Sequence, residues 1–186
     1  MGASWASGIR LYAGVATLGY LQHFGLTKLP GSLEALGHPW VIGVSKILFV
    51  GEFFADKIPL LDSGGDLVHT FIRIPSGIVL ASMAFTEYPA HIIVIAGLMG
   101  GTLALTSHTG KSTNRLVINH SPEPASNWGH SAWNDVSGVA IVALAPFAPI
   151  FTILLVALLF AGSCMILYKA WPYLKRPLFH WPKNKK

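Results

Sequence analysis

Charged residues are scarce in this chain. Asp, Glu, Lys and Arg make up 11% of its 186 residues, whereas soluble domains carry about 25%. Hydrophobic residues make up 52% and the mean hydropathy is +0.53. This composition excludes a disordered chain, because disorder needs low hydrophobicity and high net charge. Cys164 is the single cysteine, which excludes a disulfide scaffold within the chain. The composition therefore predicts a small integral membrane protein.

The sequence also lacks the motifs of soluble enzymes. It contains no G-x-S-x-G nucleophile elbow, no Walker loop and no Rossmann glycine fingerprint. Zinc-type ligand spacings are absent, and no pair of histidines is placed in mid-helix for a haem. We therefore predict no cofactor and lean against an enzyme. The metal hypothesis that remains is a divalent cation held by Asp62, Asp66 and His69, which stand at helical spacing.

Basic residues are concentrated at the C-terminus. Six of the 13 lie there, namely Lys169, Lys175, Arg176, Lys183, Lys185 and Lys186. The rest of the chain carries seven basic and eight acidic residues, so no basic stripe indicates nucleic-acid binding. We predict a single transmembrane domain over residues 1–171 and a basic cytoplasmic tail over residues 172–186, which lies beside anionic lipid.

Apolar segments of about the length that crosses a bilayer recur along the chain. They predict an all-α, polytopic transmembrane bundle with six segments: 9–26, 40–55, 66–85, 90–107, 131–145 and 150–171. Five is the alternative count, and 131–145 is the candidate for a re-entrant segment. Pro75 is placed for a kink. Gly97 and Gly101 form a G-x-x-x-G pair, for which we predict ordinary helix packing, with a dimerisation face as the alternative.

Lysine and arginine in the short loops set the orientation. The basic tail, the loop with Lys111 and Arg115 and the loop with Lys57 all fall on the inner side. Lys28, in the first connection, is the exception. This count places both the N-terminus and the C-terminus in the cytoplasm.

A first polar segment joins the second and third apolar segments. Glu52 and Asp56 stand four residues apart and share a helix face. Asp66, His69 and Arg73 then recur at spacings of three and four. Arg73 lies about two turns inside an apolar run, where an ionisable residue needs a partner. Asp56, Asp62 and Asp66 are the predicted partners.

A second polar segment follows the fourth apolar segment. His108, Lys111, Arg115 and Asn119 share a helix face, and the prolines around Glu123 predict a turn. Both polar segments fall on the predicted cytoplasmic side, so the acids of one can meet the bases of the other. The predicted binding or pathway residues are Asp56, Lys57, Asp62, Asp66, His69, Arg73, His108, Lys111, Arg115, Asn119, Glu123, Asn127 and Asp135.

Three interpretations of these segments stay open at this point. They are salt bridges and caps that fix the bundle, a polar pathway for a small solute, ion or proton, or a catalytic site. Each charge at mid-depth costs about 2.5–3.5 kcal/mol on insertion scales. A chain that needs stability alone would do as well with apolar contacts, so the polar segments favour a function.

The two segments together resemble a family of bacterial membrane proteins called domain of unknown function 4126. The resemblance rests on residues 55–59, Asp62-Ser63, Asp66, His69 and Arg73, then Ser107-His108, Lys111, Arg115, Asn119, 121–124 and Ser126-Asn127, with 6–12 similar to its opening helix. It covers roughly residues 5–145. An acidic pair expected before the fifth segment is Asn134-Asp135 here. The resemblance implies a polytopic membrane fold in a bacterial inner membrane and no particular activity.

The first functional hypothesis is a small transporter or channel with a polar cavity on the cytoplasmic side, for an ion or a small polar or anionic solute. The alternatives are a non-catalytic accessory subunit of a larger membrane complex and a metal-assisted lipid-modifying enzyme. We expect a homo-oligomer or a subunit of a membrane complex, because six short helices shield these charges poorly alone.

Overall fold

A computed structural model describes the backbone of residues 1–55, 59–119 and 124–175. Side chains are described over residues 1–54, 70–113 and 136–169, together with Gly129, Ala132 and Trp133. These parts of the chain form six α-helices and one 3-10 helix, with no strand. The elements are α1 (Gly2–His23), η1 (Gly31–Gly37), α2 (Pro39–Ala55), α3 (Pro59–Ala84), α4 (Ala90–Asn119), α5 (Pro124–Leu144) and α6 (Pro149–Lys175). The all-α prediction is confirmed.

The six α-helices correspond to the six predicted segments, but several begin earlier or end later. α4 continues through the polar residues to Asn119 rather than ending near residue 107, and α5 begins at Pro124 rather than near residue 131. Polar residues at spacings of three and four keep to one side of a helix and therefore do not end it. Proline is favoured in the first turn of a helix, where its missing N–H costs nothing. Pro124 thus begins α5, although sequence analysis assigned it to a turn.

Two helices are long and apolar enough to cross a membrane by themselves, Ala90–Thr113 of α4 and Pro149–Lys169 of α6. A third span is available if Gly31–Gly37 and Pro39–Phe54, which are bent by 72°, act as one broken segment. The described chain is therefore an all-helical protein with two or three candidate spans. The predicted count of six spans is not established by helix length and composition.

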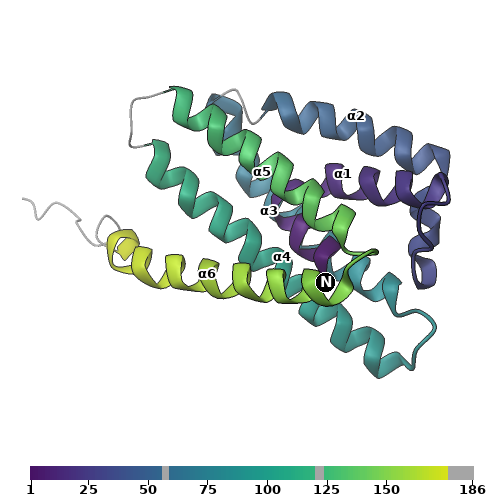
Figure 1. The fold of residues 1–186 in the computed structure, drawn as a ribbon. Coiled ribbons are helices and arrows are strands. Elements are labelled where there is room, and N and C mark those ends of the chain that lie inside the picture. The colour runs from purple at the N-terminus through teal and green to yellow at the C-terminus, as the bar shows by residue number, and fades with distance from the viewer. Residues whose placement is uncertain (56–58, 120–123, 176–186) are drawn as a thin grey trace, which may run out of the picture.

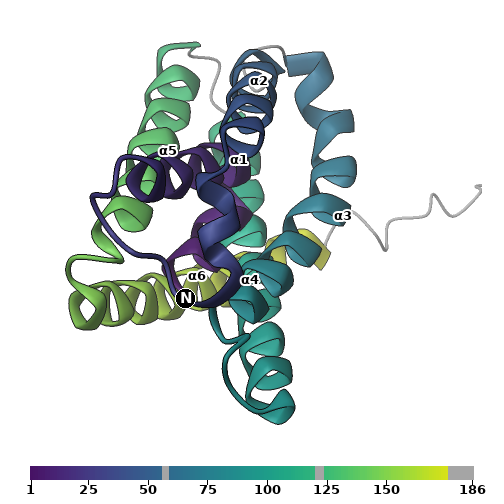
Figure 2. The ribbon, with the colours of Figure 1, turned by 90° about the vertical axis from the view of Figure 1, so that its right-hand side faces the viewer.

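Helix α1 is the centre of the fold. Its side chains are buried along most of its length, and it packs against α2, α3, α4 and α5. Figure 2 shows it between α5 on one side and α3 on the other. Such a helix needs no lipid-compatible surface, so it can carry serine, glycine and arginine. This is why sequence analysis missed its first two turns, which hold Ser4, Ser7 and Gly8.

The helical conformation of α1 is interrupted at Arg10, whose backbone angles are φ −147° and ψ 78°. The first half, Gly2–Ile9, is about 12 Å long at ~1.5 Å per residue. It starts beside the α5–α6 turn, where Gly2 lies against Ala145 and Thr152. Figure 1 shows it rising into the bundle before the second half turns sideways. Because α5 is about 31 Å long, the interruption lies near the middle of the bundle.

The helix ends that border the two polar segments lie at one end of the bundle. The last turns of α2 and α4 and the first turns of α3 and α5 gather at the upper left of Figure 1 and at the top of Figure 2. The start of α1 lies toward the opposite end, beside the α5–α6 turn. Counting loops assumes that each helix crosses from one side to the other, and on this count the N-terminus lies on the same side as the polar segments. The interruption at Arg10 means that α1 is not one straight crossing.

Glycines let α3 and α4 approach each other closely. A side chain at Gly97 would lie 2.7 Å from Ser82 Oγ, and one at Gly101 would lie 2.7 Å from Ile78 Cγ1. Both contacts are with α3 of the same chain. The G-x-x-x-G pair therefore serves packing within the bundle, as predicted.

Candidate polar core at the interruption of α1

The interruption of α1 gathers hydrogen-bond donors from α3 and α4. A helix that stops at Ile9 leaves the carbonyls of its last turn without intrahelical donors. Arg73 Nη1 donates to the Gly8 carbonyl at 3.4 Å, and Lys111 Nζ donates to the Ile9 carbonyl at 3.1 Å. The C-terminal end of a helix attracts cations. Two basic side chains therefore hold the end of this half-helix.

Serine hydroxyls from both sides complete these contacts. Ser107 Oγ donates to the Trp5 carbonyl at 2.7 Å, and Ser7 Oγ lies 3.4 Å from the Arg73 carbonyl. Gly8 is needed here, because a Cβ at this position would overlap Ser107 Oγ and the Ala104 carbonyl of α4. The close approach of α1 and α4 thus depends on the absence of a side chain at Gly8.

Arg73 forms a buried ion pair with Glu52 of α2. Its Nη2 donates to Glu52 Oε1, and each side chain is 1% exposed. Arg73 has a partner, as its place in an apolar run predicts, but Asp56, Asp62 and Asp66 were the predicted partners. The partner that the structure shows is Glu52 of α2, which precedes Asp56 by four residues in the sequence.

Histidine 108 extends the chain of contacts towards the start of α3. Its Nδ1 lies 3.3 Å from Arg73 Nη1, and its Nε2 lies 2.8 Å from Thr70 Oγ1. We call Gly8, Glu52, Thr70, Arg73, His108 and Lys111 the polar core. It joins four helices, and every member except Thr70 is buried.

The structure brings together three of the thirteen predicted residues, Arg73, His108 and Lys111. Asp56, Lys57 and Glu123 lie outside the described residues. The others lie on described helices, but their side chains are outside the described part: Asp62, Asp66, His69, Arg115, Asn119, Asn127 and Asp135. Their place in a shared site stays a prediction.

Among the described side chains, no three His, Cys, Asp or Glu residues stand close enough to hold a metal ion. The weak metal candidates Asp62, Asp66 and His69 are outside this part of the chain, so that hypothesis is not tested.

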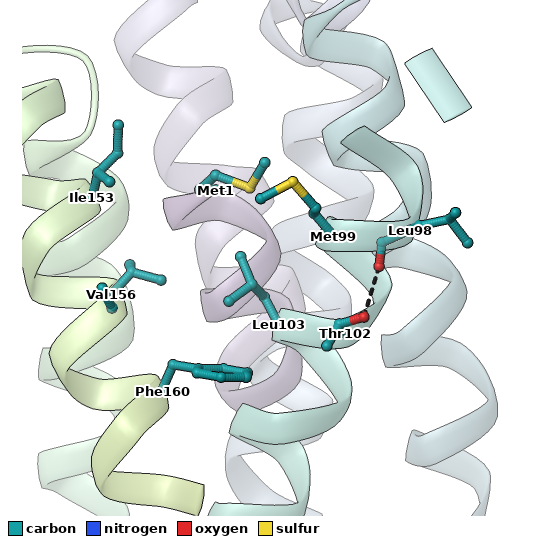
Figure 3. A pocket seen from close by; sticks show the side chains of 9 residues that line it. Met1, Leu98, Met99, Thr102, Leu103, Ile153, Val156 and Phe160 are labelled. Carbon is teal, nitrogen blue, oxygen red and sulfur yellow. Dashed lines mark hydrogen bonds between the residues drawn. The ribbon is translucent and has the colours of Figure 1, made fainter. Parts of the chain in front are cut away.

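A separate, apolar groove lies between α4 and α6 (Figure 3). It has a volume of about 430 Å³ and is lined by Leu98, Met99 and Leu103 of α4 and by Ile153, Val156 and Phe160 of α6. The hydroxyl of Thr102 at its edge donates to the Leu98 carbonyl at 2.8 Å. This groove is therefore not the polar cavity that the sequence predicts.

A comparison with known protein families covers every residue of the polar core. A family model described as Domain of unknown function (DUF4126) matches residues 1–169. The chain belongs to this family. The match extends beyond the resemblance noted above, since it adds residues 1–4 and α6 as far as Lys169. No curated protein and no solved structure matches the chain.

The whole polar core lies inside the region that this DUF4126 match covers. Two of its features escaped sequence analysis, the interruption at Arg10 and the role of Glu52. Arg10 is 1% exposed and lies in an otherwise apolar run, which is the signal that an ionisable residue faces the interior of a bundle. Glu52 was placed on a helix face without a partner, because sequence spacing cannot show which helices meet.

Proposed function

We propose that this member of the DUF4126 family is a small membrane transporter or channel that passes an ion or a small polar solute through the polar core. The observation that carries the proposal is the interruption of α1, with Arg73 and Lys111 bonded to the Gly8 and Ile9 carbonyls. Interrupted helices form the ion and substrate sites of many transporters, because their ends expose carbonyls and N–H groups at mid-membrane.

The energetic cost of burying four charged residues, three in the polar core and Arg10 at the interruption of α1, supports a functional role. Arg10, Glu52, Arg73 and Lys111 are each no more than 5% exposed. At about 2.5–3.5 kcal/mol each, four charges cost about 10–14 kcal/mol on insertion. Each hydrogen bond to a charged group returns about 1.5–3 kcal/mol. The cost of inserting the four charges is as large as the net stability of an ordinary domain, about 5–15 kcal/mol. Apolar packing at the same place would avoid this cost.

The remaining predicted residues would form the mouth of this pathway. Asp62 and Asp66 stand two turns and one turn before Thr70 on α3, while Arg115 and Asn119 continue α4 beyond Lys111. These helix ends gather at one end of the bundle (Figure 1), which supports the prediction that the two polar segments meet. Carboxylates there would attract protons or cations, and the basic residues would attract anionic groups.

We place this end of the bundle and the C-terminal tail on the cytoplasmic side of a bacterial inner membrane. Lys57, Lys111, Arg115 and the basic tail support this orientation through the bias of Lys and Arg towards the cytoplasm. The start of α1 then lies towards the opposite side, since it packs beside the α5–α6 turn.

We also propose that the chain assembles with further copies of itself. The membrane-length part of α6 is 11% buried within the chain, so α6 has most of its apolar surface available to lipid or another protein. Purification in mild detergent separates the possibilities. A particle containing several copies of this chain supports a homo-oligomer, and unrelated proteins in a fixed ratio would support the accessory-subunit alternative.

Flux measurements in proteoliposomes test the proposed function. The full chain is reconstituted, and the movement of protons, K⁺ and inorganic phosphate is followed in separate assays. Lys111→Met keeps the aliphatic length but removes the cation from the Ile9 carbonyl, so we expect it to reduce flux at least tenfold. Lys46→Met is the matched control, because Lys46 is exposed and lies over the Tyr20 ring of α1.

The proposal predicts that the parent and Lys46→Met exceed empty vesicles for at least one of the three ions, while Lys111→Met does not. Equal flux in the parent, both variants and empty vesicles for all three ions would refute it.

A further inference from the structure

Two contacts of His108, with Arg73 and Thr70, bear on its protonation state. A guanidinium can only donate hydrogen bonds, so Arg73 Nη1, at 3.3 Å, donates and His108 Nδ1 accepts. A neutral imidazole whose Nδ1 accepts carries its hydrogen on Nε2. That hydrogen is in place to bond to Thr70 Oγ1 at 2.8 Å. These two contacts fit a neutral ring with its hydrogen on Nε2.

The ion pair between Arg73 and Glu52, beside His108, forms one of the two hydrogen bonds that an arginine and a carboxylate can form. Arg73 reaches Glu52 Oε1 through Nη2, while Glu52 Oε2 and Arg73 Nε are buried and have no hydrogen-bond partner among the described residues. An arginine can pair with both oxygens of a carboxylate through two parallel N–H groups. The atoms needed for that second bond are the two that the present arrangement leaves unused.

We propose that His108 is a proton-binding site whose occupancy moves Arg73. A proton taken from water adds to the lone pair of Nδ1 and converts this acceptor into a donor. Two donors then face each other, so Arg73 leaves His108 and pairs with both oxygens of Glu52. Arg73 also leaves the Gly8 carbonyl, which frees the end of the first half of α1. This inference rests on the proposed function and names the proton as the ion that the polar core binds.

Four helices supply the charged and titratable groups of this part of the core. Among the described side chains these are Arg10 and Tyr12 of α1, Glu52 of α2, Arg73 of α3 and Lys111 of α4. Tyr12 lies within electrostatic range of both Glu52 and Arg73. The cations outnumber the carboxylate in this set, which opposes a positive charge on His108, so protonation of His108 requires Arg73 to withdraw to Glu52. Asp66 and His69 stand within one turn of Thr70 on α3, and their side chains lie outside the described part.

Nitrogen-15 NMR of histidine-labelled full chain in lipid nanodiscs tests the inference. His108→Gln identifies the His108 signals, and His91→Gln, on the exposed first turn of the same helix, is the control for the substitution. At pH 8 we expect the His108 ring in the neutral form with its hydrogen on Nε2. Between pH 8 and about pH 4.5, two units below the ordinary histidine pKa of ~6.5, we expect the doubly protonated form.

Variants at Glu52 test whether protonation of His108 depends on the Glu52 carboxylate that receives Arg73. Glu52→Gln keeps an oxygen for Arg73 but removes the second carboxylate oxygen, so we expect His108 to stay neutral over the same range. Glu52→Asp keeps the carboxylate and restores the titration, which also shows whether a loss in Glu52→Gln comes from misfolding. A ring with its hydrogen on Nδ1 at pH 8, or one that stays neutral in the parent, would overturn the inference.

The result also separates this inference from the proposed function. If His108 titrates and no ion crosses the proteoliposomes, the proton site stands and the transport proposal fails. If ions cross while His108 stays neutral throughout, the transport proposal stands and the proton site fails.

Discussion

Replacing both members of the buried ion pair by apolar residues separates its structural role from its functional role. Glu52 and Arg73 are each 1% exposed, so solvent screens their interaction very little. Removing one partner leaves the other charge buried and uncompensated, which costs about 3–5 kcal/mol. Glu52→Leu and Arg73→Met should each lower stability by that amount, and simple addition predicts about 6–10 kcal/mol for the pair.

The double variant, Glu52→Leu with Arg73→Met, should lose much less stability than this sum. Removing both charges together also removes their desolvation penalty, and such replacements are often neutral or stabilising by 1–4 kcal/mol. Arg73→Met leaves the Gly8 carbonyl and His108 Nδ1 without this donor, at a cost of about 1–3 kcal/mol each. These effects largely offset each other, so we expect a net loss of about 2 kcal/mol.

Thermal unfolding in detergent measures the difference. One kcal/mol shifts the midpoint by about 2–4 °C in a chain of this size. Each single variant should therefore melt about 6–20 °C below the parent, and the double variant about 4–8 °C below it. Flux should be absent from the double variant although it is folded. A double variant that loses as much stability as the two single variants combined would show that our account of the ion pair is wrong.

Two further predictions each use a matched control variant. Gly8→Ala places a Cβ against Ser107 and a fixed carbonyl, so it should cost about 3 kcal/mol; Gly14→Ala meets nothing closer than 3.5 Å and should melt at or above the parent. Ser107→Ala removes the hydrogen bond to Trp5 and should cost about 1 kcal/mol. Ser76→Ala removes a bond within its own helix at 2.7 Å and should change the midpoint less. Equal midpoints within either pair would contradict these contacts.

Sequence alone could predict the environment of the chain and the number of α-helices, because both follow from local composition and periodicity. It also identified Arg73 as a charge that needs a partner. Arg73, His108 and Lys111 each fall on a polar helix face, as the spacing predicts, and their role in one binding or pathway site stays a prediction. These successes concern properties that one helix carries by itself.

Features that depend on contacts between helices could not be predicted in this way. The pairing of Arg73 with Glu52 depends on how α2 lies against α3. The interruption at Arg10 depends on donors from α3 and α4, because an interrupted helix persists in the interior only where other groups bond its free carbonyls. Loop counting cannot register this interruption either, because it treats α1 as one full crossing.

The way in which the interruption of α1 is held explains why the polar core can change state. A continuous helix satisfies its carbonyls with its own N–H groups, which cannot leave without unwinding the chain. At Gly8 and Ile9 the donors are instead the ends of two long side chains, which can rotate to another acceptor without moving a helix. Glu52 Oε2 is such an acceptor beside Arg73, and it is buried with no hydrogen-bond partner among the described residues. A small charge change at His108 is therefore enough to redistribute these bonds, whereas apolar packing at the same place would allow one arrangement alone.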